Sequence, residues 1–239
     1  MSGFSPLKYP EKLFSDGTFY SAPKLAYQLL ITRVYSKELN KFFTTAFSLL
    51  TNKEQNKYYQ VFNTIKNHIF SLNKNKKYCP SEFPADFEIA MSNAFKSVFP
   101  DSKIKYCLWH FERNLEINKN KICYKEVNEN KDIFILYKCI TKLPYIDPHY
   151  LEDLYLLIKT KSNNRNFLEF LKYFYKTYFL KCPVENWNYF GGVEDTTNNR
   201  CESYNHHLYS YFNKKPTFYK LLFILREEEN YMKIEEEKL

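Results

Sequence analysis

Three acidic residues stand in surroundings that suit a metal-dependent reaction at a phosphodiester bond. Asp16 lies within the apolar-aromatic run KLFSDGTFY, Asp86 follows the segment SEFPA, and Glu202 lies in a late stretch that we interpret as a helix. Carboxylate oxygens are the ligands that Mg²⁺ takes in proteins. Two such ions, about 3.5–4 Å apart, can activate a water or a 3′-hydroxyl and stabilise the leaving oxygen. The three acids therefore predict a catalytic site that binds Mg²⁺ or Mn²⁺.

Each acid also has an ordinary structural interpretation. The dipeptide Asp16-Gly17 is a common turn signal, and Asp86 is a favoured residue type at a helix N-cap. Glu202 can be a solvated acid on the surface of a helix. The residues alone leave both interpretations open, so the surrounding pattern has to decide between them.

The elements that would position these acids begin with three consecutive strands. The runs Lys12–Tyr20, Leu25–Tyr35 and Phe42–Leu50 have strand composition and short connections, which predicts an antiparallel meander. The following segment, Lys53–Leu72, carries apolar residues at spacings of three and four, which predicts an amphipathic helix.

Two further strands, reached through helices, complete the expected sheet. A short fourth strand leads to Asp86, a helix spans Asp86–Phe99, and Ile104–Trp109 is a fifth strand before another helix. The fourth strand would lie parallel beside the first through a right-handed crossover. We therefore predict an α/β, ribonuclease-H-like fold with a mixed five-stranded sheet, three antiparallel strands followed by two parallel ones. Adjacent strands lie about 5 Å apart, so Asp16 and Asp86 would share a cation.

One residue argues against a regular fourth strand. Pro84 lies two residues before Asp86, and a proline cannot donate a ladder hydrogen bond. We expect this strand to be short or distorted.

The second half of the chain is mostly helical in pattern. We expect residues 9–118 to form the first part of the catalytic core and residues 119–185 to form a helical insertion before the last catalytic helix. The segment 186–225 then carries that helix, which we expect to run from Thr196 toward Phe212, and 226–239 is a charged helical tail.

Composition and charge narrow the class of protein. The chain has 239 residues, 44% of them apolar, and a formal net charge of +8, which favours anionic partners such as nucleic acid. None of its six cysteines forms a Cys-x-x-Cys pair, no secretory signal precedes them, and no window reaches 18 uninterrupted apolar residues. We expect a soluble, intracellular protein with reduced thiols and no membrane association.

Three blocks of sequence, in order, resemble the Mutator-like element (MULE) transposases. FSDGTFYSAP followed by AYQLLIT is similar to the family's first-aspartate segment. ADFEIAMSNAFKSVFPDSKIKYCLWHFERNL is similar to its second-aspartate segment, with a Cys-x-x-His motif at Cys107 and His110. TTNNRCESYNHHLYSYFNKKPTFYKLL is similar to the segment that bears the last glutamate. The resemblance covers roughly residues 9–225.

The resemblance implies a metal-dependent DNA transposase that cleaves DNA at transposon ends and transfers the strands to a target. It assigns Asp16, Asp86 and Glu202 to catalysis and metal binding, with Glu194 as the alternative third acid and Glu88 as a neighbour of the site. It also implies transposon-end and target DNA as partners, a homo-oligomer as the active species, and a nuclear location.

Other side chains near these blocks have both functional and structural interpretations. Cys107 and His110 supply only two zinc ligands where a structural site takes four, so we do not expect zinc; we expect the pair to pack near the active site and to lie close to DNA. Asn198 and Arg200 precede the glutamate and suit phosphate binding at a helix N-terminus. Both tryptophans, Trp109 and Trp187, are expected in the core, although Trp187 could instead stack on a flipped base.

Two rival hypotheses remain beside the transposase. Asp16 lies only fifteen residues after Met1, which leaves no room for the family's N-terminal DNA-binding module, so we expect a truncated copy. The alternative function is therefore a non-catalytic, transposase-derived domain that binds DNA or protein. A different ribonuclease-H-like nuclease would share the acids but would not explain the Cys-x-x-His and Thr-Asn-Asn blocks.

Overall fold

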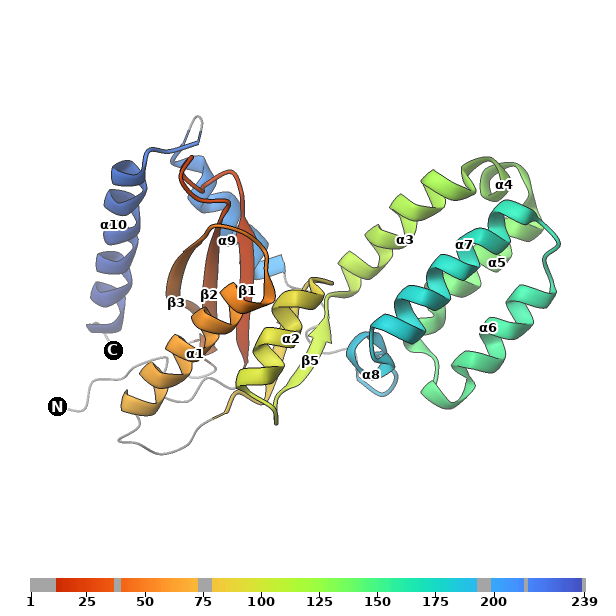
Figure 1. Cartoon of the computed structure of the whole chain (residues 1–239), viewed down its shortest axis with the longest axis horizontal. Helices are drawn as coiled ribbons and strands as arrows, with labels where there is room; N and C mark the ends of the chain where they lie inside the picture. The colour runs from red at the N-terminus through yellow and green to blue at the C-terminus, as the bar shows by residue number, and fades with distance from the viewer. Residues whose placement is uncertain (1–11, 37–39, 73–78, 193–198, 213–214, 238–239) are drawn as a thin grey trace. The chain divides into compact units, whose positions relative to one another are not determined.

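The chain divides into two compact units. The computed structural model describes residues 12–36, 40–72, 79–192, 199–212 and 215–237, and for residues 36, 72, 199–202 and 232–237 it describes the backbone alone. One unit is discontinuous and comprises residues 1–104 and 198–239, and the other comprises residues 105–197 (Figure 1). The segment 119–185, predicted as a helical insertion, lies within the second unit. The domain boundaries expected from the sequence remain predictions.

Three antiparallel strands form the centre of the first unit. They are β1 (Leu13–Thr18), β2 (Gln28–Ser36) and β3 (Lys41–Leu50), in the order β1-β2-β3. Alternate side chains point to opposite faces of a strand, so Leu29 and Ile31 of β2 share one face, while Gln28 on the other face donates to the Tyr58 hydroxyl. The expected meander is confirmed.

A second, two-stranded parallel sheet follows through helices. Its strands are β4 (Glu82–Ala85) and β5 (Lys103–Tyr106). The helix α1 (Gln55–Leu72) precedes β4, and α2 (Ile89–Val98) connects the two strands. Three buried rings join α1, β4 and α2: Phe83 stacks on Phe95 with ring centroids 3.9 Å apart, and Phe62 meets both edge-on.

The fold is α/β, with both antiparallel and parallel strand pairs. The described residues form two separate sheets, of three and two strands, in place of the one continuous five-stranded sheet that was expected. A single parallel bridge between Lys12 and Glu82 links the start of β1 to β4, and an ion pair at 3.4 Å joins the same two side chains. Pro84 explains the short ladder in part, because it removes an amide donor from a strand of only four residues.

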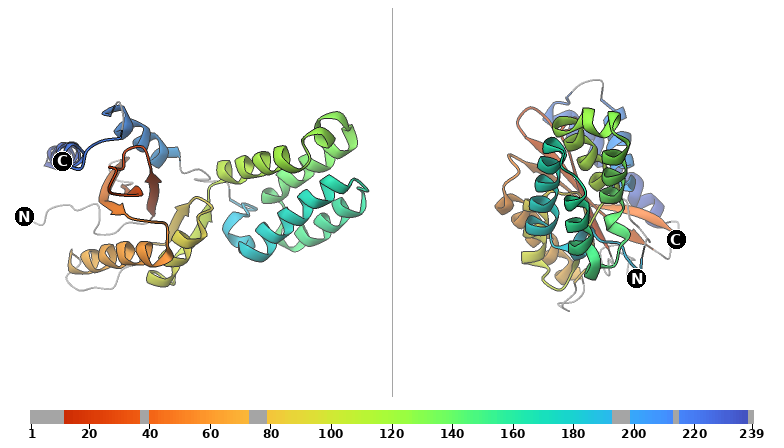
Figure 2. Two further views of the ribbon diagram at one scale, coloured as in Figure 1. Left: turned by 45° about the horizontal axis from the view of Figure 1, so that its top comes forward. Right: turned by 90° about the vertical axis from the view of Figure 1, so that its right-hand side faces the viewer.

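Two late helices cover one face of the three-stranded sheet. The helices are α9 (Asn199–Ser210) and α10 (Phe218–Glu237). Figure 2 shows α1 and α9 on opposite sides of this sheet. Apolar residues of β2 pack against the late helices in a cluster made by Ala22, Leu29, Ile31, Leu208, Phe212 and Leu221. The C-terminal segment of the chain is therefore part of the same core as its N-terminal strands.

After β5, the regular elements in the described part of the second unit are all helices. Its helices are α3 (Leu108–Ile122), α4 (Tyr124–Glu129), α5 (Lys131–Lys142), η1 (Leu143–Tyr145), η2 (Pro148–Tyr150), α6 (Leu151–Thr160), α7 (Arg165–Tyr175), the π-helical η3 (Lys176–Lys181) and α8 (Val184–Trp187). Trp187 is fully buried at the centre, where its ring stacks on Phe111 and its indole N–H donates to the Tyr178 carbonyl at 2.7 Å. Among the described helices of the whole chain, none is long and apolar enough to cross a membrane.

Candidate functional site

Asp16 lies in the middle of β1, on the face that α9 covers. It pairs with Ile31 of β2, and directly opposed residues of an antiparallel pair project from the same face. Ile31 packs against Leu208 of α9. The half-buried Asp16 carboxylate therefore faces the helix that carries Glu202.

Both carboxylate oxygens of Asp16 accept hydrogen bonds. The backbone N–H of Gly17 donates to Oδ1 at 2.8 Å, and the side-chain amide of Asn205 on α9 donates to Oδ2 at 2.5 Å. The Asn205 Oδ1 atom is buried and has no hydrogen-bond partner among the described residues. The sequence pattern does not single out Asn205, because nothing in the late segment indicates which strand residue this helix position meets.

Gly17 belongs to the strand and not to a turn. It pairs with Leu30 inside β1, so the turn interpretation of Asp16-Gly17 is wrong. A Cβ atom at this position would lie 2.6 Å from Oε1 of Gln28, a buried side chain on β2. Glycine is needed here for this close approach, which lets Gln28 reach Tyr58.

Asp86 directly follows β4 and is half-buried. Its carbonyl oxygen accepts from the Glu88 N–H at 2.7 Å, and α2 begins only at Ile89, with Glu88 in the N-cap position. Asp86 is therefore not the N-cap of α2, and the expected start of that helix at Asp86 is wrong by three residues. The tight turn Asp86–Glu88 separates the strand from the helix.

Glu88, expected as a neighbour of the acidic site, is held by residues near α1. The Tyr58 hydroxyl donates to one of its oxygens, and Lys53 forms an ion pair at 2.5 Å with the other. Burial, followed by the hydrogen bond to Glu88, raises the pKa of Tyr58 well above its ordinary value, so this hydroxyl remains a donor. Glu88 thereby ties the start of α2 to α1.

The predicted third acid and its neighbours fall at the edge of the described structure. Glu202 and Arg200 occupy the first turns of α9, where the backbone is described, so the positions of their side chains stay predictions. Glu194 and Asn198 lie outside the described residues. The helix begins at Asn199 and ends at Ser210, a shorter span than expected.

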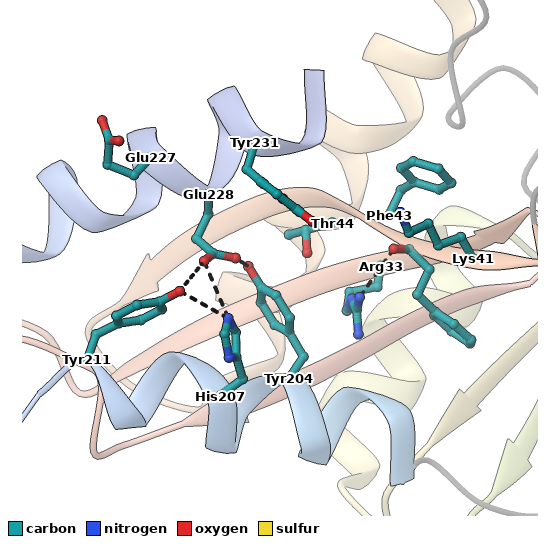
Figure 3. A pocket seen from close by; sticks show the side chains of 11 residues that line it. Arg33, Lys41, Phe43, Thr44, Tyr204, His207, Tyr211, Glu227, Glu228 and Tyr231 are labelled. Atoms are coloured by element: carbon teal, nitrogen blue, oxygen red, sulfur yellow. Dashed lines mark hydrogen bonds and ion pairs between the residues drawn. The ribbon is translucent and has the colours of Figure 1, made fainter. Parts of the chain in front are cut away.

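The other side of α9 lines a cavity of about 540 Å³ against β2, β3 and α10 (Figure 3). Glu228 of α10 is the central acceptor: the hydroxyls of Tyr204 and Tyr211 donate to it at 2.8 and 3.0 Å, and His207 lies at 3.5 Å. The Arg33 guanidinium stacks 4.4 Å from the centre of the Tyr204 ring.

These contacts attach α9 to α10 and to the sheet. Burial and the adjacent Glu228 carboxylate raise the pKa of Tyr204 and of Tyr211, so both hydroxyls stay protonated and can donate. Tyr204, His207 and Tyr211 recur at spacings of three and four, which marks one helix face in the sequence. Their shared partner, Glu228, carries no such local signal.

The Cys-x-x-His motif opens α3 in the helical unit. Cys107 is buried at the N-cap position of α3, and His110 is half-buried with its ring 4.8 Å from that of Trp109. Trp187 is in the core as expected, but the expectation for Trp109 is wrong. Its side chain is 41% exposed and carries the Arg113 guanidinium 4.9 Å from its ring centre.

No group of three His, Cys, Asp or Glu side chains gathers closely enough to hold a metal ion among the residues whose side chains the structure describes. Because the Glu202 side chain is outside that description, this finding does not test the predicted set of Asp16, Asp86 and Glu202. Among the described side chains, Asp16 supplies a carboxylate at the centre of a strand, where the Gly17 N–H and the Asn205 amide orient it.

The family comparison covers β1 to the first half of α3. Residues 13–114 match the model of the MULE transposase domain. The resemblance found in the first two sequence blocks is thereby confirmed over a segment that contains Asp16, Asp86, Cys107 and His110, and the third block lies outside the match. The match connects the chain with transposase-related enzymes, a class of nucleases that act on DNA. No curated protein matches the chain.

Proposed function

We propose that this chain is the catalytic core of a DNA transposase of the MULE type, with Asp16, Asp86 and Glu202 as its metal-binding acids. The observation that carries the proposal is the register of the Lys12–Glu82 bridge. Asp16 lies four residues after Lys12, and Asp86 lies four residues after Glu82. If parallel pairing continues from this bridge, equal offsets bring Asp16 and Asp86 to the same height and the same face, on chains about 5 Å apart. This register supports a shared cation between the two aspartates.

The docking of α9 supports the third acid. Asn205 contacts Asp16, and Glu202 precedes it by three residues, so both positions lie on one face of α9. Glu202 is thus one helical turn from a residue that touches the first aspartate. We therefore prefer Glu202 to Glu194 as the third ligand.

The donor set fits a hard divalent cation. Oxygen ligands in small number suit Mg²⁺ or Mn²⁺, whereas a structural zinc site takes four nitrogen or sulfur ligands. When bound, such ions supply charge stabilisation at the phosphodiester and lower the pKa of an attacking water or hydroxyl. The chain's own part is to hold the acids: the Gly17 amide and Asn205 orient Asp16.

The same reasoning extends to the fold and the partners. We propose that β3-β2-β1-β4-β5 is the strand order of a ribonuclease-H-like core, with the Lys12–Glu82 bridge at the junction of its two sheets. DNA at transposon ends and at a target is the proposed substrate, and a homo-oligomer in the nucleus is the form in which we expect the enzyme to act.

Calorimetric titration with Mn²⁺ tests the metal site without DNA. We expect the wild type to bind and the Asp16→Asn/Asp86→Asn variant to lose binding. Glu202→Gln should weaken it. The matched control, Asp101→Asn/Asp153→Asn, removes two exposed acids and should bind as the wild type does. Equal binding by the site and control variants would refute the assignment.

Nicking of supercoiled plasmid DNA then tests the activity. We expect Mn²⁺-dependent nicking by the wild type and the control variant, and none by Asp16→Asn. Metal binding without any nicking would favour the alternative function, a non-catalytic, transposase-derived DNA- or protein-binding domain.

A further inference from the structure

A cavity of about 500 Å³ lies within the helical unit, between α6 on one side and α7 with η3 on the other. Its lining residues are Glu152, Tyr155, Leu156, Lys159, Lys172, Tyr175, Lys176 and Leu180. The spacing of these residues explains why they meet. Positions 152, 155, 156 and 159 form one face of α6, and positions 172, 175 and 176 form one face of α7 and the start of η3.

The far side of the cavity is built from an uncommon helix type. Residues Lys176–Lys181 are π-helical. π-Helical turns are rare in proteins overall, and those that occur are often found at functional sites. Two leucines beside the cavity are unusually open for a packed helical unit, with Leu156 at 52% and Leu180 at 68% exposure. Tyr155 is buried behind them, its hydroxyl donating to the Leu171 carbonyl and its ring 5.1 Å from that of Tyr175.

Positive charge dominates this part of the unit. Between residues 154 and 184 the chain has one acid, Glu169, against six basic residues: Lys159, Lys161, Arg165, Lys172, Lys176 and Lys181. Glu169 forms an ion pair with Lys172 at 2.6 Å, but both side chains are more than half exposed, and such a pair holds its lysine weakly. Glu152 at the cavity edge is 3.5 Å from the Tyr175 hydroxyl.

We propose that this cavity binds the sugar–phosphate backbone of duplex DNA. Lys159, Lys172 and Lys176 are exposed around it and supply cations from two helices, which suits successive phosphates. The exposed side chains of Leu156 and Leu180 and the Tyr175 ring offer an apolar surface to the sugars between successive phosphates. Lysine contacts of this kind position a protein on DNA without reading its sequence.

This inference rests on the proposed function for its choice of DNA as the partner. It adds a contact surface formed by other residues, in the helical unit and outside the matched family segment 13–114. Because the contact is electrostatic, it does not require the metal ion. The two proposals can therefore be tested separately.

Fluorescence anisotropy with a labelled 30-base-pair duplex tests the inference, with the full chain in EDTA between 50 and 200 mM salt. The variant is Lys159→Gln/Lys172→Gln/Lys176→Gln. The matched control, Lys121→Gln/Lys125→Gln/Lys131→Gln, removes the same charge from exposed positions of α3, the α4 helix and α5. Both tryptophans lie in this unit, so their fluorescence reports whether each variant is folded.

Each lost phosphate contact should lower the slope of log K against log salt by about 0.9, so we expect a fall of roughly 2–3 in the cavity variant. The control should keep the wild-type slope. Equal slopes in the two triple variants, or no DNA binding by the wild type, would overturn the inference. If the cavity variant kept its DNA affinity but lost binding to polyglutamate, an acidic protein would be the partner, and the inference would again be wrong. The Mn²⁺ titration is run without DNA and fails or succeeds independently.

Discussion

Replacing Asn205 with alanine tests the contact between α9 and the first aspartate. The change removes the amide that donates to Asp16 Oδ2 from a position 189 residues away in the chain. A hydrogen bond to a charged group contributes about 1.5–3 kcal/mol net. Asp16 is half-buried and keeps the Gly17 N–H as a donor, so we take the lower part of that range. We expect the free energy of unfolding of the sheet-containing unit to fall by about 1.5–2 kcal/mol.

The two units require separate observables. Trp109 and Trp187 both lie in residues 105–197, so tryptophan fluorescence follows only the helical unit and serves as an internal control. Hydrogen exchange of the β1 and α9 amides follows the other unit. His206→Ala, at an exposed position next to Asn205, is the matched control variant and should leave both measurements unchanged.

A double-mutant cycle with Asp16→Ala isolates the pair. We expect a coupling energy of about 1–2 kcal/mol between the two sites, because Asn205 acts through Asp16. We also expect Asn205→Ala to weaken Mn²⁺ binding severalfold in the otherwise native chain and to have no further effect on binding in the Asp16→Ala background. Additive effects within about 0.5 kcal/mol, together with unchanged Mn²⁺ affinity in Asn205→Ala, would refute the positioning role.

Two further predictions concern the strand and the thiols. Gly17→Ala should destabilise the sheet-containing unit by about 1–3 kcal/mol, because its Cβ would lie 2.6 Å from the Gln28 side chain. Gly192→Ala is the control and should have little effect, because no atom lies within 4 Å of its Cβ position. Urea denaturation followed by circular dichroism measures both variants, and equal stability of the two would contradict the close approach. Burial raises the pKa of the Cys123 thiol to about 12, so at pH 8.5 iodoacetamide should label the exposed Cys139 quickly and Cys123 slowly, as read by mass spectrometry. Because the folded thiol keeps its proton at pH values where the unfolded one loses it, stability should also fall as the pH rises above the ordinary thiol pKa. Fast labelling of Cys123 in the folded protein would show that the site opens.

Much of the local structure could be predicted from patterns along the chain. The strand-type composition and short connections of the first fifty residues predicted β1, β2 and β3, and the spacing of apolar residues predicted α1 to within two residues. These elements depend on neighbours close in sequence, so the signal is local. The boundaries near Asp86 were less predictable, because an aspartate before a helix reads as a cap even when it belongs to the preceding turn.

The candidate site shows the same division. Family resemblance, carried by three blocks of sequence, predicted Asp16 and Asp86 as site residues, and the matched segment 13–114 contains both. It did not identify Asn205 or Glu228, which meet their partners only when α9 and α10 pack on the sheet. An amide or a carboxylate on a helix has the same local pattern whether it faces solvent or a strand.

By itself, the sequence indicated the family resemblance, the strand that carries Asp16 and the helical character of residues 119–185. Only the tertiary structure decided which side chains touch Asp16, that Trp187 is buried while Trp109 is exposed, and that three lysines from α6, α7 and η3 surround one cavity. The physical reason is the separation along the chain over which each signal acts. Periodicity records which face of an element is apolar, whereas a contact between residues 16 and 205 depends on how whole elements pack, and packing is selected by shape and polar partners distributed over the entire chain.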